Sequence, residues 1–230
     1  ILTLGIHGLT LGYFPAIWQD EVQIIEYGRV FAAPQERDWS TNWRLDGRPV
    51  LLPNYLGGLW QEAAFHLSRG HPWGPRLSSL LGAVLASATL LGWLLARRSP
   101  PILALLGSCL LLWDPLFTES YRGARLEGWV FACIFSSCWC IHTAVTGAAR
   151  GPRARVAAGF AGAFLALAGL IWVSAIILLP LVAHEFVTVG ATTSPKALRS
   201  AALRMVVAAV AVVLAAWVPV WRTLSSSLSD

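Results

Sequence analysis

The chain has 230 residues, of which 56% are hydrophobic and only 13% charged, and its formal net charge is +5. Soluble domains average about 45–50% apolar and about 25% charged residues, so this composition excludes an ordinary soluble globular protein. The positive charge does not indicate nucleic-acid binding, because the basic residues, all arginine except Lys196, stand at segment ends rather than in one stripe. The sequence therefore predicts an all-α, polytopic transmembrane helical bundle.

The chain opens directly on an apolar run, residues 1–18, which we interpret as the first transmembrane helix. The run begins at Ile1 rather than at Met, which is typical of a fragment. It carries neither a basic n-region nor a small-residue cleavage site, so we do not interpret it as a signal peptide.

Residues 19–76 form a polar segment that we expect to be an outer loop carrying two juxtamembrane helices. Each amphipathic stretch repeats apolar residues at i, i+3, i+4 and i+7, and four tryptophans of the segment favour an interfacial position. A turn at residues 46–49 is expected to join the two surface helices. The two stretches are Ile24, Tyr27, Gly28 and Phe31, then Leu56, Leu59, Trp60, Ala63 and Leu67, and the tryptophans are Trp39, Trp43, Trp60 and Trp73.

The transmembrane bundle proper is predicted over residues 77–221. A spanning helix needs roughly 20 apolar residues, and residues 156–183 are too long for one crossing and too short for two full ones, so we interpret them as two short helices that meet near residues 170–174. With the first run this makes about seven spans, followed by an outer tail or truncated loop at 222–230. The other predicted spans are 77–96, 101–116, 128–149 and 205–221.

Basic loops test this count, since short loops rich in Arg and Lys stay on the cytoplasmic side. Three such loops contain Arg97 and Arg98, then Arg150, Arg153 and Arg155, and then Lys196, Arg199 and Arg204. Seven spans place all three on one side of the membrane, whereas a single crossing over 156–183 would separate the last two.

The first candidate site is the carboxylate pair Asp20 and Glu21, where the first span meets the outer surface. A carboxylate there can orient an acceptor hydroxyl, take its proton or hold a divalent metal. Asp20 also suits a helix N-cap, with Gln23 completing a capping-box-like pair. Because a helix N-terminus favours the ionised form, Asp20 is better suited to orient a hydroxyl than to act as a strong base.

The second candidate site is Arg122, Arg125 and Glu127, at the outer start of the fourth span. The arginine fork suits a phosphate group, and an acid that begins an apolar run needs a partner or an interfacial position. The alternative is that both arginines snorkel to the interface while Glu127 favours the helix N-terminus.

Other chemistry is not indicated. The four cysteines lie in apolar runs without CxxC or zinc spacing and are predicted to be buried apolar residues. No phosphate-binding glycine loop, HExxH or nucleophile elbow is present. Outward carboxylates and arginines without a soluble nucleotide site favour a lipid-borne substrate.

The order of these motifs resembles the GT-C superfamily of lipid-linked glycosyltransferases, in the style of protein O-mannosyltransferases and aminoarabinose transferases. A first span is followed by Trp18-Gln19-Asp20-Glu21, by Asp46-Gly47-Arg48-Pro49 with Pro53-Asn54-Tyr55-Leu56, by Pro75-Arg76-Leu77-Ser78, and by Arg122-Gly123-Ala124-Arg125-Leu126-Glu127. The resemblance covers about residues 10–185, and the order and spacing of the motifs carry it more than any single one.

The resemblance implies an inverting glycosyltransferase that uses a polyprenyl-phosphate sugar donor on the outer face of a bacterial inner membrane. Asp20, with its neighbour Glu21, would engage the acceptor, while Arg122 and Arg125 would contact the donor phosphate and Glu127 would position Arg125. The resemblance implies no certain cofactor. A divalent metal is the alternative. The basic Lys-Gly-Pro-like turn of the family is missing at residues 170–174, and the chain is short for the family.

Two other functions stay open from the sequence. A non-catalytic GT-C-like subunit of a larger membrane complex fits the short length, the missing basic turn and the twelve tryptophans, since tryptophan gives large interface contacts. A transporter would need charged or polar residues at the bilayer midplane, and the predicted spans carry almost none.

Overall fold

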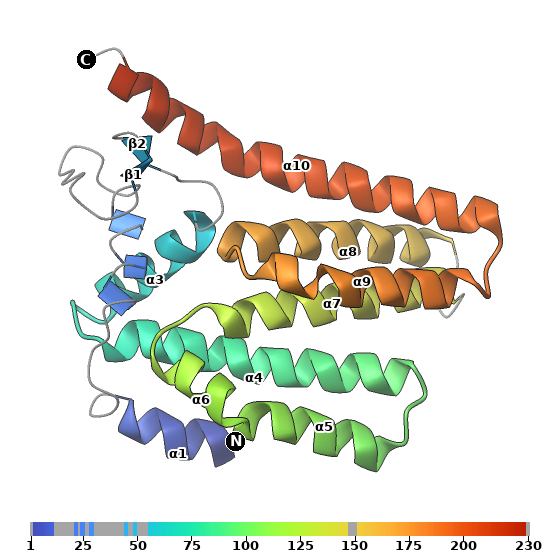
Figure 1. Cartoon of the computed structure of the whole chain (residues 1–230), viewed down its shortest axis with the longest axis horizontal. Helices are drawn as coiled ribbons and strands as arrows, with labels where there is room; N and C mark the ends of the chain where they lie inside the picture. Colours follow the sequence, from blue (N-terminus) through green and yellow to red (C-terminus); the bar gives the residue numbers. More distant parts are fainter. Residues whose placement is uncertain are drawn as a thin grey trace.

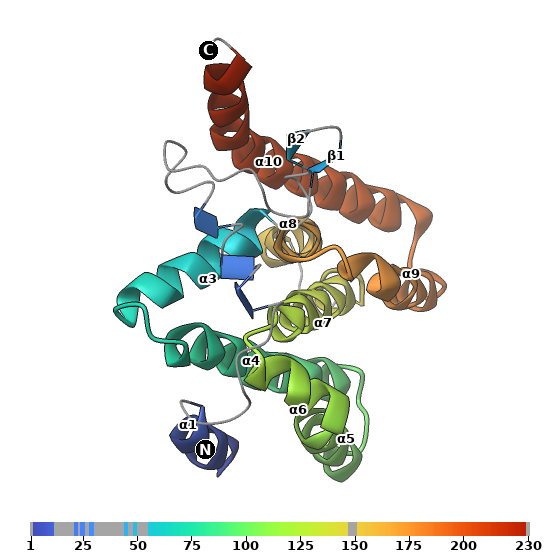
Figure 2. The same ribbon diagram turned by 60° about the vertical axis from the view of Figure 1, so that its left-hand side comes forward.

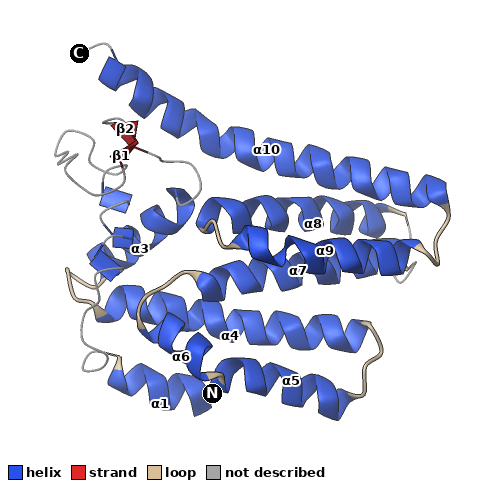
Figure 3. Ribbon diagram, viewed as in Figure 1, coloured by secondary structure: helices blue, strands red, loops and turns tan. Residues whose placement is uncertain are grey.

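The computed structural model describes residues 2–11, the positions 21–22, 24–25, 28–29, 44–45 and 48–49, and the two long stretches 55–146 and 151–228. Within these residues the fold is all-α except for one two-stranded antiparallel pair, as Figure 3 shows. The elements are α1 (Leu2–Thr10), β1 (Arg44–Leu45), β2 (Arg48–Pro49), α3 (Tyr55–Leu67), α4 (Trp73–Ala96), α5 (Pro101–Trp113), α6 (Pro115–Arg122), α7 (Glu127–Val145), α8 (Pro152–Ile171), α9 (Ala175–Gly190) and α10 (Pro195–Leu228).

Four described helices, α4, α7, α8 and α10, are long and apolar enough to cross a membrane. The pair α5 and α6, bent by 55° at Asp114, makes a fifth if it counts as one broken span. These helices indicate an integral membrane protein. α9 has 16 residues and α1 has nine described residues, both shorter than the roughly 20 needed for a full crossing, so the seven-span count stays a prediction.

Proline marks where several helices begin. Pro101, Pro115, Pro152 and Pro195 each stand at the start of a helix, where the missing N–H of proline leaves no hydrogen bond unmade. α6 also has a side-chain cap, because Asp114 Oδ1 accepts from Phe117 N at 2.9 Å. The predicted span 101–116 therefore ends earlier, at Trp113, and the chain turns into α6.

α7 is the central helix of the bundle. It packs against α4, α8, α9 and α10, and Ile134, Cys138 and Ile141 are fully buried. α10 instead lies along α8 at the edge of the bundle, as both views show (Figure 1 and Figure 2), and most of its described side chains are exposed. Small residues allow the closest approach, since a Cβ on Gly162 of α8 would meet the Met205 carbonyl of α10.

The predicted interruption of residues 156–183 is confirmed. α8 ends at Ile171, Trp172 is extended (φ −157°, ψ 140°), and α9 begins at Ala175. α8 therefore runs from the end of the bundle that holds the α7 C-terminus to the opposite end, and α9 returns.

The basic loops gather at one end of the bundle, to the right in Figure 1. Arg97 at the end of α4 contacts Glu185 of α9 at 2.7 Å, and Thr193 before α10 donates to the Val145 carbonyl at the end of α7 at 3.2 Å. We call this the basic end, and the opposite one, with α3 and α6, the outer end.

The second predicted surface helix is present as α3, whereas the first lies largely outside the described residues. Six of its positions, Glu21, Val22, Ile24, Ile25, Gly28 and Arg29, are described and helical. Between the two surface segments the chain forms a short antiparallel pair in which Leu45 faces Arg48. The predicted tail begins inside α10, which continues past Trp221 to Leu228.

Candidate functional site

The described candidate residues come together at the outer end of the bundle. Arg76 at the start of α4 contacts Glu21 and the Leu11 carbonyl that follows α1. Arg122 at the end of α6 contacts Thr10 of α1. Five segments that are distant in sequence therefore share one end: α1, the described helical positions from Glu21 to Arg29, α3, the start of α4 and the α6–α7 turn. Asp20, the first predicted catalytic residue, lies outside the described residues.

Glu21 forms a buried two-point ion pair with Arg76. Arg76 Nε donates to Glu21 Oε1 at 2.7 Å and Arg76 Nη2 donates to Oε2 at 2.9 Å, while Nη1 donates to the Leu11 carbonyl at 2.9 Å. The side chain of Arg76 is only 1% exposed and that of Glu21 only 4%. Two parallel charge-assisted hydrogen bonds fix both groups, so Arg76 ties the start of α4 to Glu21 and to the end of α1, at the position where a catalytic carboxylate was predicted.

Arg125 is held by Glu127, the pairing expected from the sequence. Arg125 Nη2 lies 2.6 Å from Glu127 Oε1, and Ser120 Oγ donates to Glu127 Oε2 at 2.9 Å. The Arg125 side chain is still 43% exposed. Arg122 turns the other way, with Nη1 at 2.9 Å from both His7 Nδ1 and Thr10 Oγ1. The two arginines predicted to contact the donor phosphate therefore have different hydrogen-bond partners in the structure.

A buried amide fixes the turn between α6 and α7. Gln61 of α3 is fully buried, and its Nε2 donates to Ser79 Oγ at 2.8 Å and to the Ala124 carbonyl at 2.7 Å. Ala124 has a φ of +54°, which is unfavourable for an L-residue and persists where surrounding contacts enforce it. Gln61 thus clamps the turn that carries Arg125 and Glu127.

A cavity of about 490 Å³ opens beside this turn, between α5, α6 and α7. We call it the α6 cavity. One part of its lining is polar, with Arg125, Glu127, Glu119 and Asp114, and the rest is apolar. The apolar part includes Leu111, Leu116, Phe117 and Phe131. A polar head with an apolar tail is the class of ligand that such a lining matches.

The acids of the α6 cavity do not make a metal centre. Across the part of the chain that the structure describes, no three His, Cys, Asp or Glu side chains are grouped as metal ligands. Asp114 is engaged in capping α6, and Glu127 is engaged with Arg125 and Ser120. The sequence-based metal alternative was placed at Asp20 and Glu21, and Asp20 lies outside the described residues, so that alternative stays a prediction.

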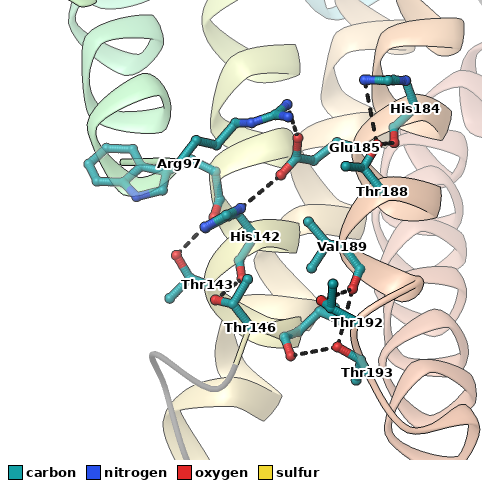
Figure 4. Close-up of polar contacts among 12 residues, drawn as sticks. Arg97, His142, Thr143, Thr146, His184, Glu185, Thr188, Val189, Thr192 and Thr193 are labelled. Atoms are coloured by element: carbon teal, nitrogen blue, oxygen red, sulfur yellow. Dashed lines mark hydrogen bonds and ion pairs between the residues drawn. The ribbon is translucent and has the colours of Figure 1, made fainter. Parts of the chain in front are cut away.

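A second ionic cluster lies at the basic end, and Figure 4 shows Arg97 and His142 converging on the carboxylate of Glu185. Arg97 Nη1 is 2.7 Å from Glu185 Oε2, and His142 Nδ1 is 3.0 Å from Oε1. Glu185 is fully buried, and the Arg97 guanidinium also stacks over the Trp93 ring at 5.6 Å. This cluster joins α4, α7 and α9. Nothing in the local sequence around His142 signals a partner 43 residues away.

Several site residues were not assigned a role from sequence. Arg76 pairs with a residue 55 positions away, and Gln61 reaches a carbonyl 63 positions away. One signal was present for Arg76, since an arginine at the start of an apolar span is costly unless paired. Among the cysteines, Cys133 and Cys138 are buried as predicted, whereas Cys109 is exposed on α5.

Searches of protein-family models, of characterised proteins and of solved structures find no match to this chain.

Proposed function

We propose that the chain is the N-terminal module of a GT-C-type membrane glycosyltransferase that uses a polyprenyl-phosphate-linked sugar. The α6 cavity supports this proposal, because it joins a guanidinium and carboxylates to an apolar wall at the outer end of the bundle. An isoprenoid phosphate sugar has the same division between polar head and hydrocarbon. The proposed setting is a bacterial inner membrane, with the segment 19–76 on the periplasmic side.

In this proposal the sugar phosphate lies beside the α6–α7 turn. The half-exposed Arg125 binds the phosphate, and Glu127 holds the guanidinium in place through Nη2. The exposed carboxylate of Glu119 accepts hydrogen bonds from sugar hydroxyls. Arg122 is assigned to anchoring α1 rather than to the phosphate, since it contacts His7 and Thr10.

The proposed reaction is a displacement at the anomeric carbon. The acceptor oxygen forms the new bond to that carbon, the bond from the carbon to the phosphate oxygen breaks, and polyprenyl phosphate leaves with the electron pair. The acceptor proton goes to a carboxylate, for which Asp20 is the candidate that the sequence offers. Glu21 is assigned a positioning role, because its carboxylate is buried against Arg76.

Binding of polyprenyl phosphate tests the proposal directly. Native mass spectrometry of the purified chain is expected to detect one bound polyprenyl phosphate, and Arg125→Gln is expected to weaken that binding by about 10- to 100-fold, the equivalent of one lost charged hydrogen bond. Arg122→Gln is the matched control, since this arginine faces α1. Equal binding by wild type and Arg125→Gln would remove the α6 cavity as the phosphate site.

A non-catalytic subunit is the second candidate, and a specific observation favours it. Both predicted acidic groups that the structure describes, Glu21 and Glu127, are engaged in ion pairs with Arg76 and Arg125. Purification from membranes at fixed stoichiometry with other subunits, together with no release of polyprenyl phosphate from the sugar donor, would favour this candidate over the enzyme.

A further inference from the structure

A second cavity lies at the outer end of the bundle, on the other side of α7. Its volume is about 460 Å³, it is open on one side, and it is lined by residues of α3, α4, α7 and α8. We call it the α3 cavity. Its lining contains no charged side chain, and Ser136 is its one hydroxyl-bearing residue. The α6 cavity, in contrast, has four charged side chains in its lining. The α3 cavity therefore matches an uncharged hydrocarbon.

The two cavities lie on opposite faces of α7. Trp129 and Cys133 line the α3 cavity, whereas Glu127 and Phe131 line the α6 cavity. Each pair is offset from the other by two residues, which at about 100° per residue places them about 200° apart around the helix axis. A ligand in one cavity is thus separated from a ligand in the other by the body of α7.

The depth of the α3 cavity matches one leaflet of a bilayer. Its lining runs from Leu126, just before α7, to Ser136, which lies ten residues further on, or about 15 Å away at about 1.5 Å per residue. The hydrocarbon core of a bilayer is about 30 Å thick, so this distance is about half of it. The cavity starts at α3, the amphipathic helix at the outer end, and continues toward the middle of the apolar spans.

The outer end of the α3 cavity is fixed in shape. Trp60 of α3 donates from Nε1 to Ser78 Oγ at 2.7 Å and meets the Trp129 ring edge to face at 5.5 Å. A Cβ on Gly57 would contact the Ile171 carbonyl at the end of α8, so α3 lies directly on that helix. These contacts hold α3 over the cavity as a roof, with Ala63 exposed at the mouth.

From these observations we infer that the α3 cavity binds the hydrocarbon chain of a second lipid of the outer leaflet, separate from any lipid phosphate in the α6 cavity. The α3 cavity is apolar, extends over about half of the hydrocarbon core and is covered by α3, so it would hold one lipid chain in place. The exposed apolar surface of α10 would instead be covered by bulk lipid that exchanges freely. In the proposed transferase this second lipid would be the acceptor, so the acceptor class is a lipid rather than a soluble sugar or a protein. That role rests on the proposed function, while the binding itself does not.

Photo-crosslinking tests the site without any sugar donor. The chain is placed in nanodiscs of phosphatidylethanolamine and phosphatidylglycerol that contain a trace of phosphatidylethanolamine with a diazirine in mid-chain. After illumination, mass spectrometry of the digest compares cross-links on α7 with cross-links on α10. We expect the cross-links to be enriched on α7 relative to α10.

Variants that fill the cavity make the test decisive. Ala63→Phe at the mouth and Ser136→Phe on the wall are expected to reduce the α7 cross-links at least five-fold and to leave those on α10 unchanged. Val210→Phe, at a position 50% exposed on α10, is the matched control and should leave the α7 cross-links intact. If Ser136→Phe disturbs folding, Ala63→Phe still decides, because its side chain points out of the core.

Two results would overturn the inference. One is equal labelling of α7 and α10 in the wild type, and the other is α7 labelling that survives Ala63→Phe. Because the assay contains no polyprenyl phosphate, its failure would leave the α6 cavity untouched. Unchanged phosphate binding in Arg125→Gln, which would count against the α6 cavity, would in turn say nothing against the α3 cavity.

Discussion

Glu21→Gln separates a structural role from a catalytic role for this residue. The substitution removes the negative charge and leaves the Arg76 guanidinium, whose side chain is only 1% exposed, without its carboxylate partner. Removing one member of a buried ion pair typically costs about 3–5 kcal/mol, because the remaining charge stays buried without compensation. We therefore expect the equilibrium constant for unfolding to increase by roughly two to four powers of ten. This effect is well above that of a substitution at an exposed position.

The assay is reversible unfolding of the purified chain, followed by its tryptophan fluorescence. A separate double-mutant cycle, built from Glu21→Leu and Arg76→Met, provides the control. The double variant Glu21→Leu with Arg76→Met should be more stable than either single variant, because it leaves no unpaired buried charge. A Glu21→Gln protein that unfolds like the wild type but has lost sugar transfer would refute the structural assignment and restore Glu21 as a catalytic candidate.

Three further outcomes follow from the packing. Glu185→Gln should lower the stability of the chain by roughly 1.5–3 kcal/mol, since it weakens hydrogen bonds to charged groups, while the exposed neighbour His184→Gln should change it little in the same unfolding assay. Gly57→Val should detach α3, because its Cβ would collide with the Ile171 carbonyl, and faster hydrogen exchange confined to α3 would report this. In detergent, N-ethylmaleimide should label the exposed Cys109 and spare the buried cysteines of α7, as peptide mapping would check.

Much of the helical architecture could be predicted because the local amino-acid composition is enough to indicate an apolar helix. The helix at 55–67 and the interruption near Trp172 follow from residues within a few positions of each. α6 was missed since its eight residues are polar overall, although Asp114 followed by proline is a helix-start signal. The pair β1–β2 was missed because two residues per strand give no alternating pattern.

The site was less predictable than the fold. Asp20 and Glu21 are neighbours in sequence, and local pattern gave both a catalytic role. Glu21 instead forms a buried ion pair with Arg76, and that pairing depends on how the start of α4 lies against Glu21. Arg122 and Arg125 are three residues apart, which suggests one shared site, yet the turn at Ala124 sends them to different neighbours. Such pairings depend on tertiary packing, which a single sequence does not record.

The short break between α8 and α9 decides at which end of the bundle the following helix, α10, begins. With the break, α9 returns to the basic end, where Glu185 contacts Arg97 and where Thr193, just before α10, donates to the Val145 carbonyl. If residues 172–174 were helical, α8 and α9 would be one continuous rod, and everything from Lys196 onward would emerge on the opposite side. Positive charge in loops resists that inversion. Three residues, Trp172 to Ser174, thus determine at which end of the bundle α10 begins.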